Sequence, residues 1–172
     1  MRPLLILALL ASATAHAQFA NRHFGIEAAP MRFTDSEFTT GLMATLDFGW
    51  YIENGFEVGG RVPVALFLTP VSNRQRVATG GQLYARYLFL EEELRPWAGL
   101  ELDVLYIFRD NPNQETNAQV FFGPGVSAGL EYFVRPDVSI GARAMFTLYL
   151  GVNNAAPIRP GYGGTLAAQV YF

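Results

Sequence analysis

Apolar and polar residues alternate along most of the chain with a period of two. From Phe56 to Leu68 every second residue is apolar or glycine, and the residues between them include Glu57 and Arg61. The same alternation occupies eight segments: 22–33, 40–52, 56–68, 78–90, 95–108, 118–134, 137–150 and 161–172. Successive side chains of a strand point to opposite faces, whereas a helix would spread these sets around its circumference. The pattern predicts eight β-strands, each with one apolar face.

The predicted strands are long, and the connections between them alternate in length. A tilted strand of ~9–11 residues crosses a bilayer, and each segment is at least that long. Short links at 53–55, 91–94 and 135–137 alternate with longer polar connections at 34–39, 69–77, 110–117 and 152–160. A barrel inserted from the periplasm has its tight turns on that side. We therefore expect an all-β, eight-stranded, antiparallel up-and-down transmembrane barrel with both termini in the periplasm.

Aromatic residues lie near both ends of the predicted strands. Trp50, Tyr87 and Trp97 are at the short-link ends, and Phe121 and Tyr149 are toward the long connections. A spanning barrel concentrates aromatic side chains where its strands cross the two membrane interfaces. This distribution supports the predicted placement across a bilayer.

The first residues have a different character from the rest of the chain. Arg2 precedes an apolar stretch at 4–13, and Ala15-His16-Ala17 gives a small-x-small pattern before Gln18. These are the parts of a secretory signal peptide, and the apolar stretch is shorter than the ~20 residues that a membrane helix needs. We expect residues 1–17 to be a signal peptide and residues 18–172 to form the barrel domain.

Composition narrows the classes of function. The chain of 172 residues is 51% hydrophobic and 16% charged, with a mean hydropathy of +0.17, which excludes a disordered chain. It has no Cys, and its twelve basic residues are all Arg, so disulfides, thiolate metal sites and lysine nucleophiles are excluded. A net charge of −3 gives no basic footprint for nucleic acid.

The leader, the eight alternating segments, the alternating connections and the ending Gln169-Val170-Tyr171-Phe172 resemble a small bacterial outer-membrane barrel of the OmpX or OmpA-transmembrane-domain type. The resemblance covers residues 18–172 and implies residence in the outer membrane. It implies contact with outer-membrane lipid and lipopolysaccharide, and a monomeric barrel. In that family the barrel-insertion machinery reads the last strand, which here corresponds to Leu166, Ala168, Val170 and Phe172. Many functions share this architecture, so the resemblance names no activity.

The polar face of the strands identifies the residues that would fill the barrel, whose interior is just wide enough for side chains. Its charged members are Glu27, Asp47, Glu57, Arg61, Arg86, Glu101, Asp103, Glu131 and Arg143, joined by Thr45, Gln82, Ser127, Ser139, Thr165 and Gln169. Buried charges are tolerated when they are paired, and Arg pairs bidentately with carboxylates. We favour a packed structural network, and the excess of acids leaves a narrow ion or solute channel as the alternative.

No catalytic, cofactor or metal site is predicted. His23 is the only histidine after the leader, and the serines form no GxSxG motif. Residues 110–115 carry oxygen ligands without the spacing of a calcium loop. We expect a structural or surface-interaction role without catalysis. The competing class is a soluble periplasmic barrel that binds an apolar ligand, which would turn its apolar residues inward.

Three prolines conflict with a barrel that has no edge strand. Pro30, Pro63 and Pro124 fall inside predicted strands, where each removes a backbone donor. We expect bulges there, with Phe122-Gly123-Pro124-Gly125 the best candidate, and a bulge would reverse the inside and outside faces on one side of it. Arg74 and Arg76 are expected in the second outer loop, where they would contact lipopolysaccharide phosphates or solvent.

Overall fold

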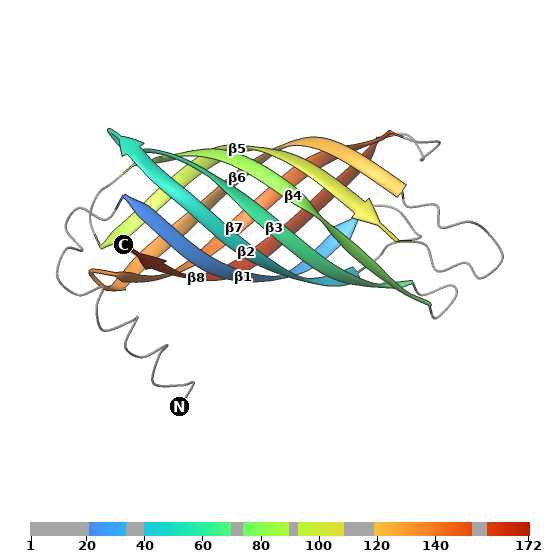
Figure 1. The fold of residues 1–172 in the computed structure, drawn as a ribbon, viewed down its shortest axis with the longest axis horizontal. Coiled ribbons are helices and arrows are strands. Elements are labelled where there is room, and N and C mark those ends of the chain that lie inside the picture. The colour runs from blue at the N-terminus through green and yellow to red at the C-terminus, as the bar shows by residue number, and fades with distance from the viewer. Residues whose placement is uncertain (1–20, 34–39, 70–73, 90–92, 109–118, 153–157) are drawn as a thin grey trace, which may run out of the picture.

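Eight antiparallel strands close into one barrel (Figure 1). The computed structural model describes residues 21–33, 40–69, 74–89, 93–108, 119–152 and 158–172. The strands are β1 (Arg22–Phe33), β2 (Thr40–Glu53), β3 (Phe56–Thr69), β4 (Arg74–Leu88), β5 (Leu94–Ile107), β6 (Gln119–Arg135), β7 (Val138–Gly151) and β8 (Arg159–Tyr171). The predicted fold class is confirmed. The expected signal peptide, residues 1–17, lies outside the described residues.

Neighbouring strands in the chain are neighbours in the wall, and β1 pairs with β8 to close it. The start of β1 lies beside the end of β8, where His23 is opposite Tyr171. The link between β2 and β3 is a tight turn in which Asn54 and Gly55 both have positive φ, at 53° and 82°. That conformation matches the right-handed twist of the two flanking strands. Closure leaves no unpaired strand edge.

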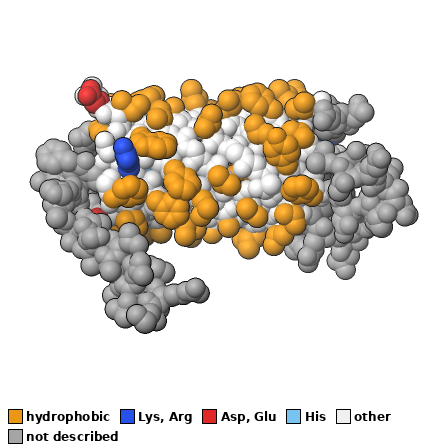
Figure 2. Space-filling model, viewed as in Figure 1, with side chains coloured by type: hydrophobic (Ala, Val, Ile, Leu, Met, Phe, Trp, Pro, Cys, Tyr) orange, Lys and Arg blue, Asp and Glu red, His pale blue; other side chains and the backbone are white. Residues whose placement is uncertain are grey.

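Each strand turns one face outward and one inward. The outward face is apolar, and the exposed fraction reaches 65% at Leu83, 67% at Leu100 and 71% at Leu166. Figure 2 shows hydrophobic side chains spread over the wall between the two ends of the barrel. A soluble ligand-binding barrel would have the opposite polarity. Within the described residues no helix is long and apolar enough to cross a membrane.

The prediction of bulges at the three prolines is wrong. At each proline the pairing to one neighbour is interrupted and then resumes in the same register, as between Arg61↔Gln82 and Val64↔Thr79 on either side of Pro63. The corresponding interruptions lie between Ala28↔Leu166 and Met31↔Gly163 for Pro30, and between Phe122↔Leu150 and Gly125↔Thr147 for Pro124.

The geometry of proline explains why the register survives. Its missing N–H faces one neighbouring strand only, and its fixed φ is compatible with an extended chain. At Pro63 the Thr79 hydroxyl donates a hydrogen bond to the Pro63 carbonyl oxygen at 3.0 Å, which tethers the two strands at the gap. The inside and outside faces therefore do not reverse, and Gly123 and Ser127, on either side of Pro124, are both buried.

Strand β4 begins earlier than the alternation predicted. Arg74 and Arg76 belong to the strand rather than to an outer loop, which corrects their expected position. Their side chains lie outside the described residues. The alternation did not predict this end of β4, because its sequence is polar and lies before the segment in which apolar and polar residues alternate.

The interior is layered along the barrel. Toward the long connections, an apolar cluster fills the lumen: Ala29, Met43, Ala65, Ala78, Leu105, Ile107, Phe121, Met145 and Tyr149. Charged and polar side chains fill the remaining length, and Trp97 and Leu88 are buried near the short turns. Trp97, Phe121 and Tyr149 were expected in the aromatic girdles, but their strand positions direct them inward.

Two adjacent glycines in β4 provide a test of the wall geometry. A Cβ added to Gly80 would collide with the carbonyl oxygen of Val104 in β5, whereas a Cβ on Gly81 has nothing within 4 Å. We expect Gly80→Ala to lower the free energy of unfolding by ~1–3 kcal/mol through overpacking. Gly81→Ala should leave it unchanged or raise it by ~0.5–1 kcal/mol, because glycine weakens a strand. Thermal unfolding of the barrel in detergent measures both, and equal midpoints would contradict the prediction.

Candidate functional site

All nine charged residues assigned to the interior by the alternation lie there. Their exposed fractions do not exceed 5%: Glu27, Asp47, Glu57, Arg61, Arg86, Glu101, Asp103, Glu131 and Arg143. Thr45, Gln82, Ser127, Ser139, Thr165 and Gln169 are buried with them. The nine charges come from seven of the eight strands, and Gln169 belongs to the eighth. The candidate site is thus a polar network shared by the whole wall.

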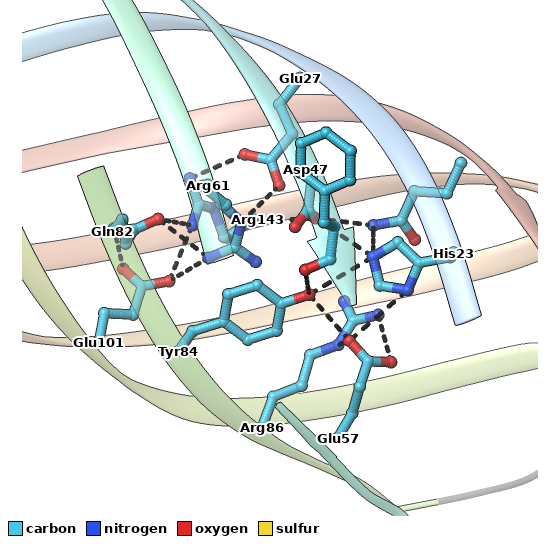
Figure 3. A network of polar contacts seen from close by, with 12 residues as sticks. His23, Glu27, Asp47, Glu57, Arg61, Gln82, Tyr84, Arg86, Glu101 and Arg143 are labelled. Carbon is cyan, nitrogen blue, oxygen red and sulfur yellow. Dashed lines mark hydrogen bonds and ion pairs between the residues drawn. The ribbon is translucent and has the colours of Figure 1, made fainter. Parts of the chain in front are cut away.

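Its centre is a ring of two arginines and two glutamates, which we call the central ring (Figure 3). The Arg61 guanidinium lies 2.9 Å from Glu101 and 3.2 Å from Glu27. The Arg143 guanidinium lies 2.8 Å from each of the same two carboxylates. Two positive and two negative groups therefore alternate around the ring, and each charge contacts two of opposite sign. The ring joins β1, β3, β5 and β7, which are alternate strands of the barrel.

Gln82 of β4 connects the central ring to Asp103. Its amide oxygen accepts hydrogen bonds from Arg61 at 3.0 Å and Arg143 at 3.1 Å. Its amide nitrogen donates to Glu101 at 3.1 Å and to Asp103 at 2.5 Å. One neutral side chain thus satisfies groups of both signs, using both ends of its amide.

A second pair lies nearer the short turns. The Arg86 guanidinium contacts the Glu57 carboxylate with two nitrogens, at 2.8 and 2.9 Å. The second of these contacts is a hydrogen bond, and both bring the opposite charges together at close range, as a buried ion pair requires. Arg86 also stacks over the Trp97 ring at 5.0 Å and lies 3.6 Å from Glu131. Trp97 therefore packs against the ion pair instead of facing the membrane.

Sequence reasoning did not assign His23 to this network. The imidazole is 3% exposed and lies 3.5 Å from Asp47 and 3.7 Å from Glu57. Asp47 in turn lies 3.4 Å from Arg61, so His23 and Asp47 connect the Arg86 pair to the central ring. The sequence could have placed His23 in the lumen, because His23 and Glu27 are an even number of residues apart in β1 and therefore share a face.

Two tyrosines, Tyr84 and Tyr171, extend the network nearer the short turns and were also missed. The Tyr84 hydroxyl donates to Glu57 at 3.0 Å, and its ring lies under the Arg61 guanidinium at 3.9 Å. The Tyr171 hydroxyl and the Ser139 hydroxyl both donate to Glu131. Tyrosine serves here because a large apolar body fills the lumen while its hydroxyl reaches a carboxylate.

Asp103 marks the boundary between the polar network and the apolar cluster. Its carboxylate accepts hydrogen bonds from Gln82, from the Thr147 hydroxyl at 3.0 Å and from the Tyr149 hydroxyl at 3.1 Å. Beside it is a cavity of about 20 Å³, lined in part by Thr45 and Met43. That volume is enough for about one water molecule. Beside Asp103 the described side chains therefore leave space for little more than one water molecule.

The chemistry of the network is that of ion pairs and hydrogen bonds. His23 faces carboxylates, and Ser139 hydrogen-bonds Glu131 and Gln169. Among the described residues no group of three or more His, Cys, Asp or Glu side chains is placed to hold a metal ion. The arrangement holds strands together across the lumen.

The residues of the expected insertion signal lie on the outside of the barrel. Leu166 is 71% and Phe172 62% exposed, Ala168 is exposed and Val170 is half-buried. All four share the outward face at the end of the chain, separate from the lumen network.

Comparison with known proteins identifies the architecture. No protein-family model matches the chain, and no curated protein sequence matches it significantly. Among solved structures, Neisserial surface protein A is 18% identical with a TM-score of 0.71, over 88% of this chain and 97% of that one. The N-terminal barrel domain of Pseudomonas aeruginosa OprF is 18% identical with a TM-score of 0.59, over 88% and 98%. The predicted likeness to small outer-membrane barrels is confirmed for the fold.

The same fold also occurs in an enzyme. The outer-membrane enzyme PagL is 14% identical to this chain with a TM-score of 0.55, over 86% of this chain and 99% of that one. Because these identities are low, the likeness establishes the shape of the barrel. What the lumen does follows from its residues.

The central ring can be tested against an ion pair whose arginine is exposed to solvent. Arg143→Met should lower the free energy of unfolding by ~3–5 kcal/mol, because it leaves the Glu27 and Glu101 carboxylates buried with one arginine fewer. Arg135→Met is the control: the Arg135 side chain is 59% exposed and lies 3.3 Å from the buried Asp137, so solvent already screens the charge that is removed and the loss should be smaller. Thermal unfolding in detergent measures both. A similar midpoint for the two variants would show that the ring does not stabilise the barrel.

Proposed function

We propose that this chain is an integral outer-membrane barrel with a structural or surface-interaction role, a filled lumen and no catalytic activity. The observation that carries the proposal is the polarity of the wall. Large apolar side chains are exposed on every strand, from Ile26 in β1 to Leu166 in β8, while the charged network is enclosed. An apolar surface of this extent is unfavourable in water. In lipid it is satisfied, and a closed barrel leaves no backbone group unpaired at an edge.

Aromatic contacts support an interface at the short-turn end. Phe24 and Phe48 lie 5.1 Å apart on neighbouring strands, and Tyr87 and Phe89 lie 5.5 Å apart at the end of β4. Trp50, exposed at 49%, is on the same end of β2. Such side chains favour the level of lipid headgroups. We assign this end to the periplasm, because tight turns occupy that side of outer-membrane barrels.

The proposed partners follow from this location. The wall would contact outer-membrane phospholipid and lipopolysaccharide, and Leu166, Ala168, Val170 and Phe172 would present the last strand to the barrel-insertion machinery. Each chain closes its own barrel, since β1 pairs with β8, and we propose a monomer. The structural role falls to the lumen network, which ties the strands together from inside.

The channel alternative has less support. A conducting path needs polar surface along the whole lumen, but the apolar cluster that includes Ile107 and Phe121 fills it toward the long connections. Below that cluster the charges are engaged with one another, as in the central ring. An enzymatic role also has less support, since His23 is buried among carboxylates rather than beside a nucleophile.

Membrane integration predicts a specific pattern of extraction and migration. The protein should stay with membranes washed in urea and enter solution with detergent. The folded barrel should migrate differently from the boiled protein on a gel, because the closed wall resists unfolding by the detergent. Release by urea alone would contradict the proposal and favour a soluble periplasmic barrel.

A filled lumen predicts that the barrel does not conduct. Planar bilayers containing the folded protein should show the current of the bare lipid, because apolar side chains occlude the lumen. The control is heat-modifiable migration of the same preparation, which verifies that the protein in the bilayer is folded. Stable stepwise currents from such a preparation would favour the narrow channel instead.

A further inference from the structure

Two glycines on the outer faces of neighbouring strands β3 and β4 are not required by their protein surroundings, and Gly164 on β8 is a third. At Gly80 and Gly99 an added Cβ would collide with backbone atoms of the neighbouring strand. At Gly60 the nearest atoms would be 3.6 and 3.7 Å away, which is ordinary contact, and at Gly81 nothing lies within 4 Å. Glycine weakens a strand because it has no side chain to pack. Gly60 and Gly81 differ from Gly164 in that they lie on neighbouring strands and together leave a hollow in the apolar wall.

These glycines form the floor of a groove on the membrane-facing side, which we call the β2–β5 groove. Its volume is about 480 Å³. Phe48, Gly60, Leu83 and Leu102 follow one another across β2, β3, β4 and β5 in the strand register. Trp50 lines the groove at its short-turn end, and Val104 lines it toward the other end. Its side-chain walls are apolar, because Arg61 and Gln82 turn their side chains into the lumen.

We propose that the β2–β5 groove binds one acyl chain of a phospholipid of the inner leaflet, an inference that rests on the proposed membrane location. The groove belongs to the same apolar wall that lipid would cover. It begins at the aromatic belt beside Trp50 and Phe48, at the level proposed for the headgroups, and continues toward the middle of the barrel. That position selects the periplasmic leaflet and hence phospholipid over lipopolysaccharide. An acyl chain has no polar group along its length, and the groove walls offer it none.

Trp50 provides a reporter inside the groove. The chain has two tryptophans, and Trp97 is 5% exposed in the lumen, so Trp97→Phe leaves Trp50 as the only tryptophan emitter. The barrel is reconstituted into vesicles that mix ordinary phosphatidylethanolamine with the same lipid brominated near the head of one acyl chain. Bromine quenches tryptophan on contact. If lipids contact Trp50 at random, quenching rises with the mole fraction of brominated lipid along a curve that can be calculated. If the groove holds an acyl chain, quenching at low mole fractions should lie above that curve.

Filling the groove should remove this excess. In the Trp97→Phe background, Gly81→Leu occupies the open space at the floor, and Gly60→Leu is a second variant that fills it from β3. The matched control is Ala128→Leu, which fills a groove of about 500 Å³ between β5 and β6 that lacks Trp50. We expect both glycine variants to fall to the random-contact curve and the Ala128 variant to keep the excess. Heat-modifiable migration verifies that each variant has folded.

The outcomes separate the acyl-chain site from the membrane location. Quenching that is unchanged in the folded Gly81→Leu and Gly60→Leu variants overturns the site and leaves the location intact. The acyl-chain site is also overturned if the parent barrel sediments as a dimer and the Gly81→Leu variant sediments as a monomer. In that case the occupant of the groove is a second copy of the chain. Failure of every variant to be quenched, with the protein recovered outside the vesicles, contradicts the membrane location itself.

Discussion

The central ring is the interaction on which the rest of the barrel depends. Glu27, Arg61, Glu101 and Arg143 balance their charges among themselves across the lumen, at distances of 2.8–3.2 Å. A barrel of eight strands has an interior just wide enough for side chains and too narrow to hydrate such groups fully, so each is stabilised by a partner on another strand. Because the partners belong to β1, β3, β5 and β7, the ring fixes the positions of alternate strands around the wall. The other polar contacts extend from it, through Gln82 to Asp103 and through Asp47 to His23.

The polarity of the two ends of the lumen follows from this arrangement. Near the short turns the network continues to Glu131, Ser139 and Tyr171, so the wall is tied from inside as far as the last residues of β8. Toward the long connections, beyond Asp103, packing of apolar side chains predominates among the described residues, although Gln119 and Arg159 are also buried at that end. The barrel thus uses directional contacts over one part of its length and close packing over the other.

Much of this structure could be predicted from the sequence because a closed barrel enforces the period of two. Alternation alone located the strands and assigned charges such as Glu27 and Arg143 to the inside. It assigned aromatic and imidazole groups less well, because their polarity does not reveal the face: Trp97 and Tyr84 belong to the lumen, whereas Trp50 and Tyr87 belong to the wall. Their spacing from the charged residues of the same strand, even or odd, would have assigned each of them to the lumen or to the wall.

The prolines show a different limit. The missing N–H of proline removes one hydrogen bond from the strand pairing. Whether a bulge or an unpaired gap results depends on the neighbouring strand. Beside Pro63 the neighbour is the Gly80–Gly81 pair, and Gly80 approaches β5 so closely that a side chain would not fit. The pairing is interrupted at Pro63 and the register is preserved. A single sequence without its pairing partners carries no signal of this choice.

The central ring also makes completion of the barrel cooperative. Arg61 and Arg143 are separated from Glu101 by 40 and 42 residues, and Glu27 is contributed by the first strand. A partly assembled sheet without β7 would hold Glu27 and Glu101 with one arginine, at a wall still open to lipid. Unbalanced charge is least tolerated there, so partial barrels are penalised relative to both the unassembled chain and the finished one. The interior charges therefore make assembly cooperative, because Arg143 of β7 balances a carboxylate contributed by β1.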